Sequence, residues 1–174
     1  MVPAVFGFCA IMVVSLTPHV LRAQVTEQTS DFSFRPQGGG YAVIGSGGVQ
    51  GLRIGGKVNT TNRTSIELSI GTVPFLELSG LKARIYGTAY NYYIRGDHVA
   101  TGFFSFVAAY AVVTTTSDEY EGNLLLFGPT LGVDYSPERQ WSLFLRMGLP
   151  GGFSSAGKPK TTFTLDLGAG WRMW

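Results

Sequence analysis

The chain has almost no cysteine and little charge. Its only cysteine, Cys9, lies in an apolar N-terminal segment, so the rest of the chain can form neither a disulfide nor a thiolate metal site. Charged residues make up 14% of the sequence, against about 25% in a typical soluble domain. The formal charge of +2 is too small to indicate a nucleic-acid partner. Long apolar runs are also missing after residue 23, so any membrane crossing beyond that point has to use strands.

The first 23 residues predict a cleavable secretory signal. Residues 2–16 are almost wholly apolar, and Ala23 provides the small residue expected before the cleavage point. A retained membrane helix is the alternative, but the apolar run is shorter than the roughly 20 residues that spanning requires. Removing residues 1–23 takes away Arg22 and lowers the formal charge from +2 to +1. Residues 24–40 are polar, end in three glycines and predict a flexible lead-in.

From residue 41 to residue 174 the sequence predicts a single all-β domain. It is rich in glycine and aromatic residues, and apolar and polar residues alternate between breaks at Gly, Pro, Asn and Asp. This pattern predicts a closed eight-stranded antiparallel up-and-down barrel. The expected strands are residues 41–47, 50–58, 65–76, 80–94, 98–114, 123–135, 141–150 and 161–174. Residues 41–58 can also be read as one long bent strand, but an even strand number favours two.

The connections between these strands fall into two groups. Residues 59–64, 95–97 and 136–140 are short and polar, as periplasmic turns of bacterial outer-membrane barrels are. Residues 115–122 and 150–160 are longer and are expected at the opposite end. Both chain termini then lie on the periplasmic side.

The polar face of the strands is expected to line the barrel interior. A soluble barrel points its apolar face inward, whereas a membrane barrel inverts this arrangement. Small residues on the polar face leave room for long charged side chains of both signs. The predicted interior network consists of Arg53, Lys57, Glu67, Lys82, Arg84, Asp134, Arg146, Asp166 and Arg172. Hairpin spacing sets Lys57 opposite Glu67 and Arg146 opposite Asp166, and the alternative is ordinary ion pairs on a solvated surface.

Two stretches of the strand pattern need separate interpretation. In residues 80–94 the alternation places Leu81, Ala83 and Ile85 toward lipid, and Lys82, Arg84 and Tyr86 inside. In residues 102–113 both faces are apolar, so their facing is undetermined. Pro129 removes one ladder donor within a strand, which predicts a bulge or a local gap.

Amphipathic aromatic residues cluster near the predicted periplasmic turns and the chain end. Such rings are stable at a membrane interface because one edge is apolar and the other meets water. The predicted interface aromatics are Tyr92, Tyr93, Tyr135, Trp141, Trp171 and Trp174.

The export signal, the hairpin meander and the terminal strand resemble the small outer-membrane β-barrel families, such as the OmpX/Ail-like and opacity-protein-like barrels. The resemblance covers residues 41–174 and implies a bacterial outer-membrane location in contact with lipid. It also implies insertion by the barrel-assembly machinery, which reads a terminal strand with apolar residues at alternate positions before a final aromatic. Residues 163–173 fit this pattern, whereas Trp174 lies one step past the register, so it either overhangs or follows a bulge.

The sequence offers little for catalysis. Some barrels of this type modify lipid A and need a nucleophile beside a base, but after residue 23 the only histidine is His98, and no His-x-Ser motif is present. The glycine-rich stretches lack the remaining residues of a phosphate-binding loop. The acidic cluster Asp118, Glu119 and Glu121 could bind a divalent cation weakly, although a solvated acidic loop is the simpler interpretation. No enzyme activity, cofactor or metal site is predicted.

The leading functional hypothesis is therefore a non-enzymatic outer-membrane barrel with a filled, charge-paired interior. It would act in envelope integrity or surface interaction through residues 115–122 and 151–160. One alternative is a narrow pore or small-solute transporter. Another is a secreted soluble barrel that binds an apolar ligand, which requires apolar side chains inside. The sequence does not determine the oligomeric state.

Overall fold

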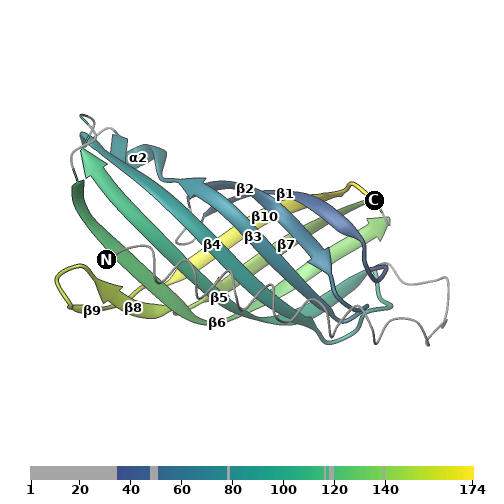
Figure 1. Cartoon of the computed structure of the whole chain (residues 1–174). Coiled ribbons are helices and arrows are strands. Elements are labelled where there is room, and N and C mark those ends of the chain that lie inside the picture. Colours follow the sequence, from purple (N-terminus) through teal and green to yellow (C-terminus); the bar gives the residue numbers. More distant parts are fainter. Residues whose placement is uncertain (1–34, 48–50, 78, 116, 118–119, 139) are drawn as a thin grey trace. The chain divides into compact units, whose positions relative to one another are not determined.

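The computed structural model describes residues 35–47, 51–77, 79–115, 117, 120–138 and 140–174. The predicted signal segment and residues 24–34 of the lead-in lie outside this part of the chain. The ordered elements are β1 (Gly40–Gly47), β2 (Leu52–Asn59), β3 (Thr64–Thr72), α2 (Pro74–Glu77), β4 (Leu81–Tyr93), β5 (Ala100–Thr115), β6 (Tyr120–Glu138), β7 (Trp141–Gly148), β8 (Gly151–Ser154), β9 (Pro159–Thr161) and β10 (Thr164–Arg172). Long tilted strands form the wall, and α2 and the C-terminus lie at opposite ends (Figure 1).

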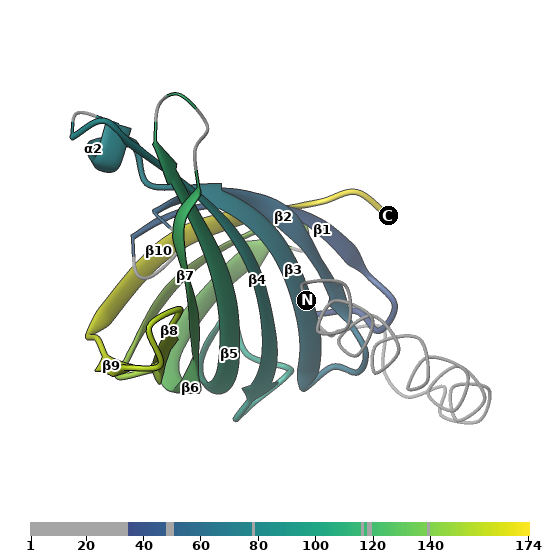
Figure 2. The same ribbon diagram turned by 60° about the vertical axis from the view of Figure 1, so that its left-hand side comes forward.

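The strands close into a ring in which every pairing is antiparallel. The first strand pairs with the last, β1 with β10, and β5 pairs with β6. The segments β7 and β8 both pair with β6 and together form one strand of the wall. Segment β10 pairs with β7, and β9 pairs with β8, so β9 and β10 together form the next strand. The expected all-β closed eight-stranded barrel is therefore confirmed, with β1 and β2 as separate strands. In Figure 2, β3, β4 and β5 lie in front of β7 and β10, which belong to the opposite wall.

The stagger of the strands sets their tilt. Leu145 on β7 pairs directly with Val133 on β6. Following the register the other way round the barrel, through β10 and β1 to β5, leads from Leu145 to Asn123 on β6. The difference between positions 133 and 123 is a stagger of ten residues. With eight strands this corresponds to a tilt of about 40°, so each residue advances about 2.5 Å along the barrel axis.

Most strands point apolar residues outward and polar residues inward. On β10, Leu165 and Leu167 are exposed, whereas Asp166 between them is buried. The stretch with undetermined facing is resolved on β5, where Phe104 is exposed and Phe103 is buried. The large hydrophobic side chains left exposed on the outer wall include Ile44, Ile54, Leu68, Ile70, Phe106, Leu131, Val133, Leu143 and Leu145.

The prediction of which side chains of β4 face the barrel interior was wrong near the start of the strand. Ala83 and Ile85 are buried in the barrel, and Arg84 between them is exposed on the outer wall. The alternation itself is present, but near α2 the barrel interior is apolar. Ile85 packs there with Ala109 and Ala111 of β5. An apolar residue therefore gains a packed interior position at this end of the strand, and the charged neighbour is directed outward.

The end of β3 also differs from the prediction. The strand expected over residues 65–76 ends at Thr72, and the chain turns through α2 before β4. Among the described residues no helix is long and apolar enough to cross a membrane.

Pro129 lies at a local gap in the wall, as expected. It stays in register with Phe106 of β5. On its other side the β6–β8 pairing ends at Phe127 and the β6–β7 pairing begins at Thr130. The wall strand formed by β7 and β8 is interrupted at the same level. The backbone N–H that Pro129 lacks is therefore not required for pairing with that strand.

The chain termini of the barrel meet at the end that also carries the connections at residues 59–64, 95–97 and 136–140, here called the terminal end. The end with α2 and the β8–β9 hairpin is called the loop end. Met173 N–H donates to the Gly40 carbonyl, and no register shift occurs in the β1–β10 pairing. Trp174 therefore overhangs the terminal strand and does not follow a bulge.

Candidate functional site

The barrel interior gathers six of the nine charged residues predicted to lie there. Each comes from a strand position that points into the lumen, and each is at most 6% exposed. They are Arg53, Lys57, Glu67, Asp134, Arg146 and Asp166. Because the lumen of an eight-stranded barrel is only wide enough for side chains, residues from opposite walls come into contact.

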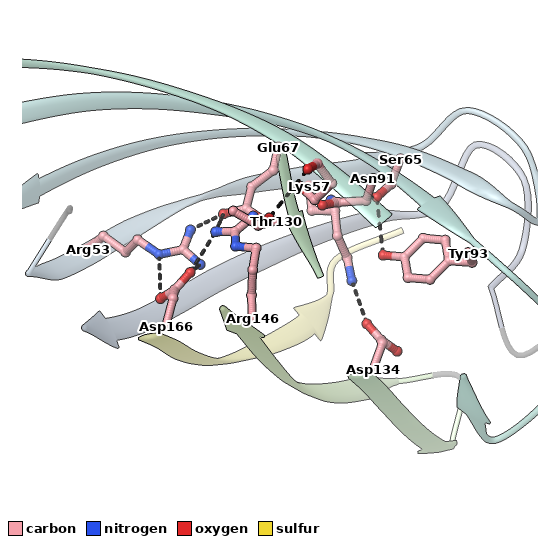
Figure 3. A network of polar contacts seen from close by, with 11 residues as sticks. Arg53, Lys57, Ser65, Glu67, Asn91, Tyr93, Thr130, Asp134, Arg146 and Asp166 are labelled. Carbon is pink, nitrogen blue, oxygen red and sulfur yellow. Dashed lines mark hydrogen bonds and ion pairs between the residues drawn. The ribbon is translucent and has the colours of Figure 1, made fainter. Parts of the chain in front are cut away.

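Four of these residues form a network on the side of the loop end (Figure 3). Arg53 Nη2 and Arg146 Nη2 lie 2.8 and 2.6 Å from Asp166 Oδ2. Arg53 Nη1 also bonds Glu67 Oε1, and Arg146 Nη2 lies 3.8 Å from the same oxygen. Two guanidinium groups and two carboxylates thus neutralise one another inside the barrel. Charge-assisted bonds of this kind are among the strongest in proteins.

A second network lies toward the terminal end and is centred on Asp134. Arg35 Nη2 lies 2.6 Å from Asp134 Oδ1, and Lys57 Nζ lies 3.5 Å from Asp134 Oδ2. Ser136 Oγ donates to the same carboxylate at 2.7 Å, and Lys57 Nζ donates to Ser142 Oγ at 3.5 Å. This network links β2, β6, β7 and the segment that precedes β1.

Arg35 was not predicted as a lumen residue. The residue is 2% exposed, and its Nη1 also donates to the His98 carbonyl at 2.9 Å. Gly38 N–H donates to the Asn59 carbonyl and Asn59 Nδ2 donates to the Pro36 carbonyl. Residues 35–39 therefore pack against the terminal end, and the flexible lead-in predicted over residues 24–40 is wrong for them. The sequence carries no signal for this, because a single arginine in a polar segment has no periodicity.

The hairpin pairs predicted from spacing are in register, but their ion pairs are partly different. Lys57 lies opposite Glu67, and Arg146 lies opposite Asp166. Arg146 does bond Asp166. The carboxylate nearest Lys57 is that of Asp134, which belongs to a strand that is not its neighbour. Closure of the barrel places β2 and β6 across a narrow lumen, and hairpin spacing contains no information about such contacts.

Aromatic rings separate the charged groups in the lumen. Phe144 lies beneath two guanidinium groups, with its ring centroid 5.3 Å from Arg53 Cζ and 5.7 Å from Arg146 Cζ. Lys57 Nζ lies 5.0 Å from the Tyr41 ring centroid. A cation over an aromatic face is stabilised by the ring quadrupole. These rings hold the charged side chains in place and fill the space between them.

Tyr93 belongs to the lumen, and its predicted place at the membrane interface was wrong. It is 2% exposed, lies under Arg35 and shares a hydrogen bond with Ser65 at 3.2 Å. Asn91 Nδ2 donates to the same serine at 3.1 Å. Successive residues of a strand point to opposite faces, so Tyr92 and Tyr93 could not both face outward.

Three other predicted lumen residues lie elsewhere. Arg84 is exposed on the outer wall, and Lys82 is half-buried on the same face of β4. Arg172 is half-buried at the terminal end, where its Nε donates to the Trp174 carbonyl at 2.9 Å. The lumen at the level of Lys82 and Arg84 is filled by the apolar cluster around Ile85.

The remaining predicted interface aromatics lie on the outside at the terminal end. Tyr92, Tyr135, Trp171 and Trp174 are between 45% and 67% exposed. Trp141 is half-buried, pairs in register with Trp171 and meets Tyr135 edge-on, with ring centroids 6.3 Å apart.

The described residues contain little that could act on a substrate. His98 is about half exposed, and its Nε2 lies 2.8 Å from Arg95 Nη1. Within the described part of the chain no group of three or more His, Cys, Asp or Glu could hold a metal ion. The acidic cluster at residues 118–121 lies outside the side chains that the structure describes. The lumen carboxylates are all held by arginine or lysine, an arrangement that ties walls together.

Comparisons with known proteins agree on the fold. No protein-family model and no curated protein matches the sequence. The N-terminal β-barrel domain of Pseudomonas aeruginosa OprF matches with a TM-score of 0.60 and 16% identity, over 79% of this chain and 98% of that one. Neisserial surface protein A matches with a TM-score of 0.52 and 13% identity, over 78% and 95%. Ail, the attachment invasion locus protein of Yersinia pestis, matches with a TM-score of 0.41 and 13% identity, over 79% and 99%. At these identities the likeness to the OprF domain and to Neisserial surface protein A concerns the fold alone, and it is the fold expected from the resemblance.

Proposed function

We propose that this chain, which has the fold of the small eight-stranded outer-membrane barrels, resides in a bacterial outer membrane as a non-enzymatic barrel with a filled, charge-paired interior. It would stabilise the envelope or make surface contacts through its loops. The observation that carries this proposal is the inversion of the wall, with apolar side chains outside and two ion networks inside.

The outer wall supports a lipid environment. Residues such as Ile54, Leu143 and Leu167 are exposed on strands around the barrel. A soluble monomer rarely exposes a contiguous apolar surface larger than a few hundred Å², and closed barrels are the only β-structures that span membranes. We therefore favour the membrane barrel over the secreted soluble barrel, whose apolar side chains would point inward.

The interior supports a structural role more than transport. Arg53, Arg146, Glu67 and Asp166 meet across the lumen, and Arg35 enters it from the terminal end. Side chains that pair across the lumen occupy the path that a solute would take. A pore or transporter is therefore the less favoured function.

The loop end supports contact with other molecules. The β8–β9 hairpin extends there, and Lys158 and Lys160 on it are exposed. The terminal strand β10, which runs from the loop end to the terminal end, carries apolar residues at alternate outward positions, including Leu165, Leu167 and Trp171. This pattern fits recognition by the barrel-assembly machinery during insertion.

Cell fractionation with heat-modified electrophoresis tests the proposal. We expect the protein in the outer-membrane fraction, migrating in SDS at one position without heating and at another after boiling, because a closed barrel resists the detergent until it is heated. As a control, a variant with Leu167→Arg on the outer wall should insert less, since a charge facing lipid costs about 2–4 kcal/mol at the midplane. A protein found in the soluble periplasm with no heat-dependent shift would contradict the membrane location.

A further inference from the structure

Arg84 is an arginine on the outer wall of the barrel. It is exposed, and it makes no hydrogen bond or ion pair with any residue that the structure describes. Its neighbours in register are Thr72 on β3 and Val112 on β5. A guanidinium group on a lipid-facing wall is unfavourable unless something outside the barrel satisfies its donors.

The height of Arg84 on the barrel indicates what that partner is. The outward positions of β4 below it hold Tyr86, Thr88, Tyr90 and Tyr92, and Ile94 follows directly after the strand. Ten residues separate Ile94 from Arg84, which at about 2.5 Å of axial rise per residue is about 25 Å. An apolar band about 25 Å tall is typical of outer-membrane barrels. Arg84 therefore lies where the hydrocarbon layer ends and the lipid headgroups begin.

The side chains around Arg84 fit such a boundary. Lys82 lies two residues away on the same outer face and adds a second positive charge. Asn123, which belongs to the same register row, donates through Nδ2 to the Tyr110 hydroxyl at 3.2 Å. Tyr86, which is two residues from Arg84 toward the terminal end, pairs in register with Tyr110. Amphipathic rings below and cationic groups above are the arrangement found at a membrane interface.

This polar patch is confined to one side of the barrel. At the loop end of β7 and β10 the outward residues are Leu149 and Phe163, which are 64% and 63% exposed. Among the side chains that the structure describes, no carboxylate faces Arg84. Arg84 therefore presents its positive charge and its hydrogen-bond donors toward the surrounding lipid.

We propose that Arg84, assisted by Lys82, binds the phosphate group of an anionic lipid in the leaflet at the loop end. A guanidinium group presents paired N–H donors that match two phosphate oxygens, and both members of this bond are charged. The inference rests on the proposed membrane location, and it adds a specific lipid contact to it.

Native mass spectrometry of the full barrel in detergent tests the inference. The protein is mixed with phosphatidylglycerol, and the bound lipid is counted for the wild type, for Arg84→Gln with Lys82→Gln, and for a control with Arg63→Gln and Arg95→Gln. The control also removes two positive charges, but in exposed turns at the terminal end. We expect about a tenfold weaker lipid binding in the first variant, from the loss of charge-assisted bonds, and unchanged binding in the control.

Three outcomes would overturn the proposal. Equal loss in both variants means that only net charge matters. Displacement of the lipid by equimolar inorganic phosphate means that the patch is a site for free phosphate. Lipid binding that appears only after Asp118→Asn, Glu119→Gln and Glu121→Gln means that the acidic loop of the same chain is the natural partner.

A heat-dependent shift retained by every variant shows that the barrel is folded. Failure of lipid binding can then be told apart from failure of the membrane location, which fractionation measures.

Discussion

At the scale of single residues, Asp134 connects several groups of the barrel interior. It is 1% exposed and is the carboxylate partner of both Arg35 and Lys57. Ser136 donates to it as well. A buried charge is tolerated only when it is paired and hydrogen-bonded. Loss of this carboxylate would remove the negative charge that Arg35 and Lys57 share at the terminal end.

Asp134→Asn should therefore destabilise the barrel by about 3 kcal/mol, because breaking a buried ion pair leaves an uncompensated charge. Urea unfolding of the refolded protein in vesicles, followed by tryptophan fluorescence, measures this difference. Asp97→Asn is the matched control, since its carboxylate is 74% exposed. Equal stability of the two variants would mean that Asp134 is not needed to balance the lumen charges.

At the scale of secondary-structure elements, glycines on the inner face determine how large side chains fit. Gly168 on β10 lies beside Phe144 of β7, and a Cβ at this position would be 2.3 Å from the Phe144 ring. Gly132 on β6 stands in the same relation to Phe103. A glycine on one strand thus lies opposite a large aromatic side chain on the neighbouring strand and leaves room for it. The ring of Phe144 can then lie beneath Arg53 and Arg146.

Gly168→Val and Ala169→Val make a matched pair on one strand. The first adds volume inside against Phe144, and the second adds volume on the outer wall. We expect Gly168→Val to lower the free energy of unfolding by about 1–3 kcal/mol through overpacking, and Ala169→Val to change it by less than about 0.5 kcal/mol. Urea unfolding in vesicles compares them, and a larger effect of Ala169→Val would contradict the assigned facing of β10.

At the scale of the whole molecule, the barrel is occupied at several levels along its axis. The apolar cluster around Ile85 and the network of Arg53 and Asp166 fill the lumen toward the loop end. Asp134 and its partners fill the lumen toward the terminal end, where Arg35, which precedes β1, enters through the open end of the barrel. Ion passage would require both networks to open together.

The reconstituted protein should accordingly show no stable conductance in planar bilayers. Arg35→Ala should also stay closed, because the network of Arg53, Glu67, Arg146 and Asp166 still crosses the lumen. Single-channel recording of both proteins, with a known porin as a positive control, measures this. Steady channels from the wild type would favour the pore, and channels from Arg35→Ala alone would assign the barrier to the terminal end.

The sequence by itself determined the strand number, the antiparallel closure and the hairpin partners of Lys57 and Arg146, because alternation and turn spacing are local properties that a strand expresses wherever it lies. Only the tertiary structure decided the phase of β4, the pairing of Lys57 with Asp134, the burial of Tyr93 and the entry of Arg35 into the lumen. These depend on what stands across a closed lumen, and closure with a ten-residue stagger brings together residues that no local pattern connects. Arg84 faces outward in the closed barrel, whereas the alternation in the sequence predicted that it lies inside.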